Sequence, residues 1–82
     1  MHEWLEAARD RIAVEAGVDG GELSLTEEEI SALLDLARVA AHDSGDRTNA
    51  PLVCFLLGRA IGREPGYDVS VLARAASSSG DS

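Results

Sequence analysis

Apolar residues recur at helical spacing in four segments of this 82-residue chain, which predicts four helices. The first helix is expected over residues 2–16, and Gly17 is placed to end it in the left-handed conformation. Its expected buried stripe consists of Leu5, Ala8, Ile12 and Ala16, with Trp4 beside it. Residues 18–25 are expected to form a loop, because the pair Gly20-Gly21 interrupts a helix.

The second helix has the clearest start. Thr26 and Glu29 have the spacing of a capping box, in which each side chain binds the backbone N–H of the other residue. The helix is expected to end around Asp43, before Gly45. Its expected stripe consists of Ile30, Leu33, Leu34, Ala37, Ala40 and Ala41, widened by Leu36 and Val39. A stripe this wide indicates a helix buried over more than half of its circumference.

The third helix is expected to begin with Pro51 at its first position, with Asn49 or Ala50 as the cap, and to end near Gly62. Residues 52–57, LVCFLL, are apolar on every side, so this helix is predicted to lie at the centre of the bundle, shielded from water. Replacing Phe55 with alanine is therefore expected to cost roughly 3–5 kcal/mol.

A fourth, short helix is expected over residues 69–76, with Asp68 as its cap, and residues 77–82 are expected to be a disordered polar tail. Ala and Leu dominate the apolar residues, whereas aromatic residues make up only 4% of the chain, which favours closely packed helices. The predicted fold is all-α: a compact bundle of three main helices plus a short fourth, in a single domain over residues 1–76.

The charge is strongly acidic and unevenly distributed. The chain has 15 acidic residues and 7 arginines, no lysine, and a net charge of −8. Residues 1–46 hold twelve of the acids and three arginines, so nearly all of the excess lies in the N-terminal half. This balance argues against nucleic acid and against an anionic membrane as partners, because both require a cationic face. The acidic half is either a solvated surface or complementary to a basic partner.

Few residues suit metal or covalent chemistry. A single cysteine, Cys54, lies in the apolar run and is interpreted as structural. The two histidines, His2 and His42, are not at metal-ligand spacing from each other or from Cys54, so neither a metal nor a cofactor is expected. Phosphate-binding loop, nucleophile-elbow and dinucleotide-binding motifs are also missing, so we do not expect an enzyme.

The sequence also predicts the cellular compartment of the protein. The longest apolar run, from Pro51 to Leu57, is far shorter than a membrane span, and the N-terminus shows no signal peptide. A cytoplasmic protein is therefore expected.

One segment could recognise a ligand. Arg47 and Asn49 precede the third helix, whose N-terminus offers free N–H groups, and His42 lies in the last turn of the second helix. These three residues are the candidate site for a phosphate or carboxylate group. The alternative is structural: Arg47 pairs with a nearby aspartate, Asn49 caps the third helix, and His42 satisfies the last carbonyls of the second.

Several blocks together resemble a known family. They are Trp4-Leu5, the block LDLARVAAH over residues 34–42, and the pattern R-x-x-A-P-L-x-x-F-L-x-G-x-A-x-G over residues 47–62. The sequence is similar to a small actinobacterial helical domain of unknown function, found alone or fused to the C-terminus of molybdenum cofactor guanylyltransferases. The loop at 18–25 departs from that family in being longer. The family has no assigned catalytic residues.

Two hypotheses of function follow. The first is a non-enzymatic helical accessory or protein-interaction module, which the resemblance associates with biosynthesis of the molybdenum cofactor (molybdopterin guanine dinucleotide). Its partner would be a molybdenum cofactor nucleotidyltransferase or a second copy of the chain, since so much of the second and third helices is apolar. The alternative is a small-molecule binder that recognises an anionic group through His42, Arg47 and Asn49.

Overall fold

A computed structural model describes residues 3–64 and 66–77 of the chain. These residues form the helices α1 (Glu3–Ala16), α2 (Glu27–Ser44), α3 (Asn49–Arg63) and α4 (Val69–Ser77), with a short 3-10 helix, η1 (Gly20–Leu23), between α1 and α2. The described ranges contain no strand, and the predicted all-α fold class is confirmed. α4 includes Ser77, and the rest of the predicted tail lies outside the described residues.

Local signals set most helix ends where the sequence placed them. Gly17 adopts a left-handed conformation with φ of 73°, and the N–H of Val18 donates to the carbonyl of Ala13 at 3.0 Å. The capping box at the start of α2 is complete, with Thr26 and Glu29 each binding the backbone N–H of the other. Asp68 accepts from the N–H of Ser70 at 2.8 Å, as expected of the α4 cap.

Two local predictions are wrong. Residues 18–25 are not simply a loop, because Asp19 accepts a bond from the N–H of Gly21 and starts the turn of η1. The third helix also begins earlier than expected, at Asn49, so that neither Asn49 nor Ala50 is its cap. Asp46 explains the early start, since its carboxylate accepts from both the N–H and the hydroxyl of Thr48 and fixes the turn that leads into α3.

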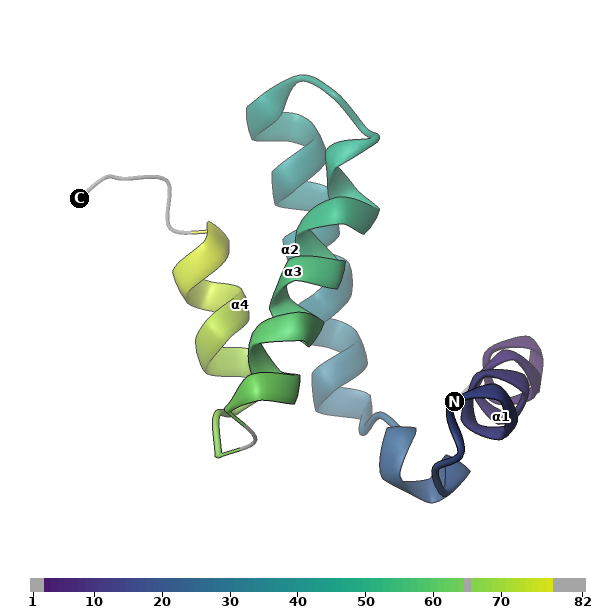
Figure 1. Cartoon of the computed structure of the whole chain (residues 1–82). Helices are drawn as coiled ribbons and strands as arrows, with labels where there is room; N and C mark the ends of the chain where they lie inside the picture. The colour runs from purple at the N-terminus through teal and green to yellow at the C-terminus, as the bar shows by residue number, and fades with distance from the viewer. Residues whose placement is uncertain (1–2, 65, 78–82) are drawn as a thin grey trace.

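α2 is the centre of the bundle, because both α3 and α4 pack along it (Figure 1). Leu36 of α2 is the most buried large side chain, at 2% exposure. It shares a core with Leu57 of α3 and with Val69 and Ala73 of α4. The sequence pattern predicts that Leu36 lies at the edge of the α2 stripe. It becomes the centre because α4 packs on that side of α2.

The prediction that α3 lies at the centre is therefore wrong. Its inner side contributes Val53, Cys54, Leu57 and Ile61 to the core. Its opposite side is open to solvent, since Leu52, Phe55 and Leu56 are 60–61% exposed. Among the described helices, only α2 and α4 pack against α3, and α4 is short, so these two helices cannot surround it.

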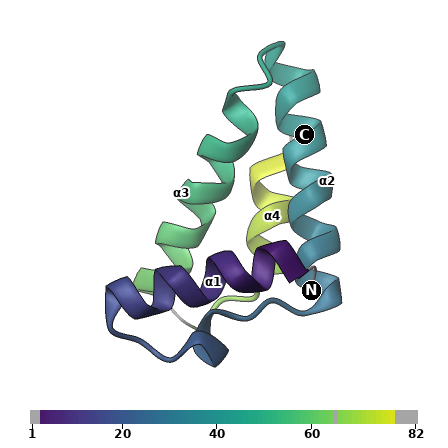
Figure 2. The same cartoon turned by 90° about the vertical axis from the view of Figure 1, so that its right-hand side faces the viewer.

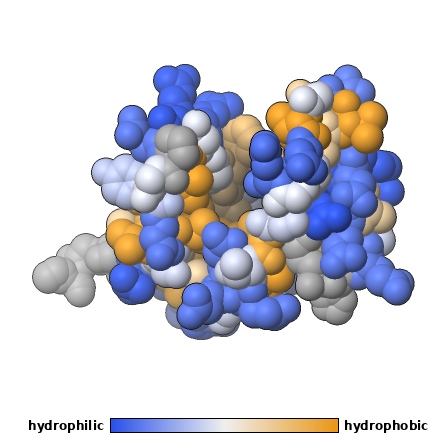
Figure 3. Space-filling view, turned by 90° about the horizontal axis from the view of Figure 1, so that it is seen from below, coloured by the Kyte–Doolittle hydropathy of each residue, from blue (hydrophilic) through white to orange (hydrophobic). Residues whose placement is uncertain are grey.

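α1 stands apart from the other helices. It packs against η1, and no Cα atom of α1 lies within 8 Å of a Cα atom of α2, α3 or α4 among the described residues. Figure 2 shows it crossing the lower end of the α2–α3 pair. Seen from below, α1 forms a separate lobe with a recess between it and the body, and hydrophobic surface is visible on both lobes (Figure 3).

Candidate functional site

The most distinctive surface of the molecule is the uncovered side of α3. We call it the outer face of α3 and define it by Leu52, Phe55, Leu56 and Arg59. These residues follow the i, i+3, i+4, i+7 spacing, which places them on one side of the helix. The sequence explains this surface. Residues 52–57 are apolar on every side of α3, and α2 and α4 cover only part of its circumference, so an apolar side stays exposed.

The outer face carries positive charge at its C-terminal end. The guanidinium carbon of Arg59 lies 4.8 Å from the centre of the Phe55 ring, in a cation–π contact that holds the arginine over the apolar surface. Arg63 follows one turn later, and α3 contains no acidic residue. The surface is thus an apolar ridge with a cationic end, which suits an amphipathic partner with acidic groups.

Apolar surface continues from this ridge towards α4. A groove of about 340 Å³ between the two helices is lined almost entirely by apolar atoms, including Leu56 and Ala60 of α3 and Ala75 and Ala76 of α4. The small alanine side chains leave this groove shallow and open. Leu56 belongs both to the groove and to the outer face, so the two form one continuous apolar surface.

On the inner side of α3, Cys54 faces α2. Its thiol lies 4.0 Å from the backbone carbonyl of Leu33, and burial raises the pKa of this thiol. A raised pKa leaves less of the reactive thiolate at neutral pH. The geometry is that of a packing residue, as the sequence suggested.

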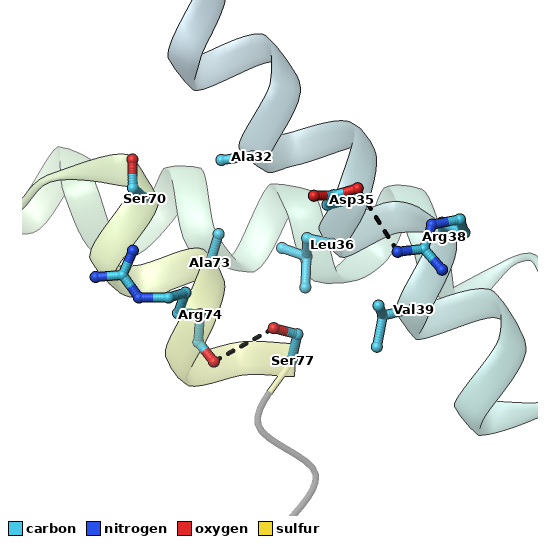
Figure 4. Close-up of a pocket in the computed structure, with 9 residues that line it drawn as sticks. All are labelled: Ala32, Asp35, Leu36, Arg38, Val39, Ser70, Ala73, Arg74 and Ser77. Atoms are coloured by element: carbon cyan, nitrogen blue, oxygen red, sulfur yellow. Dashed lines mark hydrogen bonds and ion pairs between the residues drawn. The ribbon is translucent and has the colours of Figure 1, made fainter.

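A second recess lies between α2 and α4 (Figure 4). Leu36 and Ala73 lie at its base, while Asp35, Arg38 and Arg74 lie around it. The guanidinium of Arg38 turns towards Asp35 and pairs with it at 3.6 Å, while the guanidinium of Arg74 points away from Arg38 on the other side of the recess (Figure 4). The two guanidiniums therefore do not converge on a point where both could bind one anion.

The residues predicted to bind an anion are not joined into one site. His42 is exposed and lies 3.4 Å from the carboxylate of Asp43, while the amide of Asn49 donates to the hydroxyl of Ser44 at 3.0 Å. The Arg47 side chain is exposed. Within the described ranges, no hydrogen bond or ion pair links any two of His42, Arg47 and Asn49.

A carboxylate already lies beside the start of α3. Asp46 accepts from the N–H of Thr48 at 3.0 Å and from its hydroxyl at 2.7 Å. The hydrogen bond from the Thr48 hydroxyl lowers the pKa of Asp46 most, and the bond from the Thr48 N–H lowers it further. The carboxylate of Asp46 therefore stays ionised. A fixed negative charge at this helix start repels an incoming anion. The geometry therefore gives the anion-site hypothesis no support, and it stays a prediction.

The fold and this surface define a small all-α domain whose chief feature is an open apolar helix face. The model of one protein family, a domain of unknown function (DUF6457), matches residues 1–81. That match covers nearly the whole chain, and the chain belongs to this family. No match is found among curated proteins or among solved structures. None of the described helices is both long and apolar enough to cross a membrane.

Proposed function

We propose that this chain is a non-enzymatic accessory module that binds another protein through the outer face of α3. The observation that carries the proposal is the exposure of Leu52, Phe55 and Leu56, three large apolar side chains in adjacent turns of one helix. Scattered exposed apolar residues are ordinary, but a contiguous ridge marks an interaction site. Aromatic and arginine side chains such as Phe55 and Arg59 are also the types that contribute most at protein interfaces.

The partner we propose is a molybdenum cofactor nucleotidyltransferase, and the process is molybdopterin guanine dinucleotide biosynthesis. This part of the proposal rests on the resemblance of the sequence to a domain that also occurs fused to molybdenum cofactor guanylyltransferases. A domain fused to an enzyme in one protein and separate in another commonly contacts the same enzyme in both. The outer face of α3 is the surface that such a contact would cover.

Binding to a purified molybdenum cofactor guanylyltransferase from the same organism tests the proposal. We expect saturable binding by calorimetry that Phe55→Ser weakens at least tenfold. Val71→Ser is the matched control, because Val71 is also an exposed apolar residue but lies on α4, outside the outer face of α3. Equal affinities of the native chain and Phe55→Ser would contradict the proposed surface, and no binding at all would contradict the proposed partner.

A further inference from the structure

An open cavity lies between the segment that links α1 to α2 and the packed helices. Its volume is about 350 Å³, within the range of small-molecule sites in proteins. Leu23 and Leu25 of the linking segment contribute to its lining. The rest of its apolar lining comes from α2, α3 and α4, through Leu33, Cys54, Leu57, Ile61 and Val69. None of these residues belongs to the outer face of α3, so the cavity is a separate site.

Gly58 keeps this cavity open. It lines the cavity from the interior of α3, and no atom lies within 4 Å of the position that a Cβ atom would occupy there. Glycine inside a helix is less stable than alanine. Neither a positive φ nor a close contact requires glycine at this position. What the glycine provides is therefore the open space itself, which a side chain would fill.

The lining of the cavity is negatively charged. It contains Glu22 and Glu29 and no basic residue. One carboxylate oxygen of Glu29 is held by the capping box, whereas Glu22 is exposed and has no hydrogen bond or ion pair with another described residue. Arg9 reaches the lining through its bond to Ser24, but Asp10 pairs with Arg9 at 2.8 Å and offsets its charge. The cavity thus combines an apolar interior with two carboxylates.

We propose that this cavity binds a small amphipathic amine, with its apolar body inside the cavity and its ammonium group beside Glu22 and Glu29. An ammonium group donates charge-assisted hydrogen bonds to carboxylates, and burial of the apolar body adds the hydrophobic effect. The same two carboxylates repel an anion of similar shape. The net charge of −8 also attracts cations to the chain. This site is independent of the docking surface in the proposed function.

Titration with octylamine, followed by amide NMR shifts, tests the site. We expect saturable shifts centred on residues 22–25, 33, 54, 58 and 61, which line the cavity. Octanoate has the same number of carbon atoms but a negative charge, and it should bind at least tenfold more weakly. Equal affinities for the two probes would overturn the proposal. So would shifts that spread over the whole acidic surface without saturation.

A leucine at position 58 tests whether octylamine enters the cavity. Gly58→Leu should fill the space and weaken octylamine binding at least tenfold. Gly62→Leu is the matched control, because Gly62 lies on the same helix beside equally open space but does not line the cavity. Leucine favours helix, so circular dichroism should show that both variants keep their helix content. Equal affinities of the two variants would place octylamine outside the cavity and overturn the proposal.

A change of charge tests the position of the ammonium group. Glu22→Gln should weaken octylamine binding several-fold, whereas Glu28→Gln should not, because Glu28 lies outside the cavity in the first turn of α2. Equal losses would mean that only the overall charge attracts the amine, which contradicts the site. Phe55→Ser, the variant that tests the proposed function, should leave octylamine binding unchanged. Either proposal can therefore fail without the other.

Discussion

Leu57 and Leu52 lie on the same helix and have the same side chain, but their surroundings are opposite. Leu57 is 7% exposed and belongs to the core shared with Leu36, Val69 and Ala73. Leu52 is 60% exposed on the outer face of α3. The inner face of α3 stabilises the fold by packing in the core, and the outer face of α3 is available to a binding partner. Apolar composition alone therefore does not distinguish a stabilising side chain from a binding one.

Truncating the two leucines should give the largest difference between the faces. Leu57→Ala removes core contacts and leaves a cavity, so we expect the free energy of unfolding to fall by about 2–5 kcal/mol. Leu52→Ala is the matched control and should cost less than about 1 kcal/mol, because its side chain is mostly in water. Urea unfolding at low micromolar concentration measures both. Equal losses would mean that the outer face is covered within a single chain.

Phe55→Ala sharpens the comparison on the outer face of α3 itself. The sequence-based expectation of a 3–5 kcal/mol loss is wrong for a single chain, since Phe55 is 61% exposed. In dilute solution we expect a loss below about 1 kcal/mol. Urea unfolding of the native chain and of the variant measures this loss, and a loss as large as that of Leu57→Ala would refute the exposure of Phe55.

The reactivity of the Cys54 thiol tests whether the inner face of α3 is shielded from solvent. Burial raises the pKa of its thiol, so iodoacetamide should alkylate it several-fold more slowly in the folded chain at pH 8 than in urea. The control is Leu52→Cys combined with Cys54→Ala, which moves the thiol to the outer face and should react at nearly the unfolded rate. Mass spectrometry follows both reactions. Equal rates in the two folded proteins would place Cys54 in solvent.

Asp46 lies just before α3, and Asp46→Asn should have the smallest effect on stability of these changes. Its pKa in the folded chain lies below the ordinary value of 3.8, so the ionised carboxylate stabilises the fold above about pH 4. That contribution disappears as the pH falls through the lowered pKa. Between pH 5 and pH 2 the melting temperature of the native chain should therefore fall slightly more than that of Asp46→Asn. A smaller fall for the native chain than for Asp46→Asn would contradict the stabilising role of the hydrogen bonds from Thr48 to Asp46.

Short-range signals in the sequence predicted the local structure well. Thr26 and Glu29 form the expected capping box, Gly17 takes the left-handed conformation, and Asp68 binds an N–H of the first turn of α4. Each depends on bonds between residues that are close in the chain, so the pattern of residues contains the whole interaction. The start of α3 was missed because Asp46 competes with Asn49 as the residue that binds a free N–H, and sequence alone does not rank them.

The candidate site was predicted less well. His42, Arg47 and Asn49 are close in sequence, but His42 lies beside Asp43, the Asn49 amide binds Ser44, and Arg47 is exposed. The residues of the outer face of α3 were predicted to be buried. The sequence LVCFLL nevertheless contained a signal that one side of the helix is exposed. A helix apolar on every side needs neighbours on every side, and a short fourth helix cannot supply them. Counting the helices available to cover residues 52–57 would have indicated an exposed ridge.

By itself, the sequence determined that this chain is helical, where most of its helices begin and end, and that residues 52–57 of α3 are apolar on every side. Only the tertiary structure decided that α2 is the hub, that Leu57 is buried while Leu52 is open, and that α1 stands apart. The physical reason is that caps and turns are interactions within a few residues, whereas burial depends on how many surfaces compete to cover one another. The hydrophobic effect has no direction, so an all-apolar helix does not specify which of its sides the fold will use.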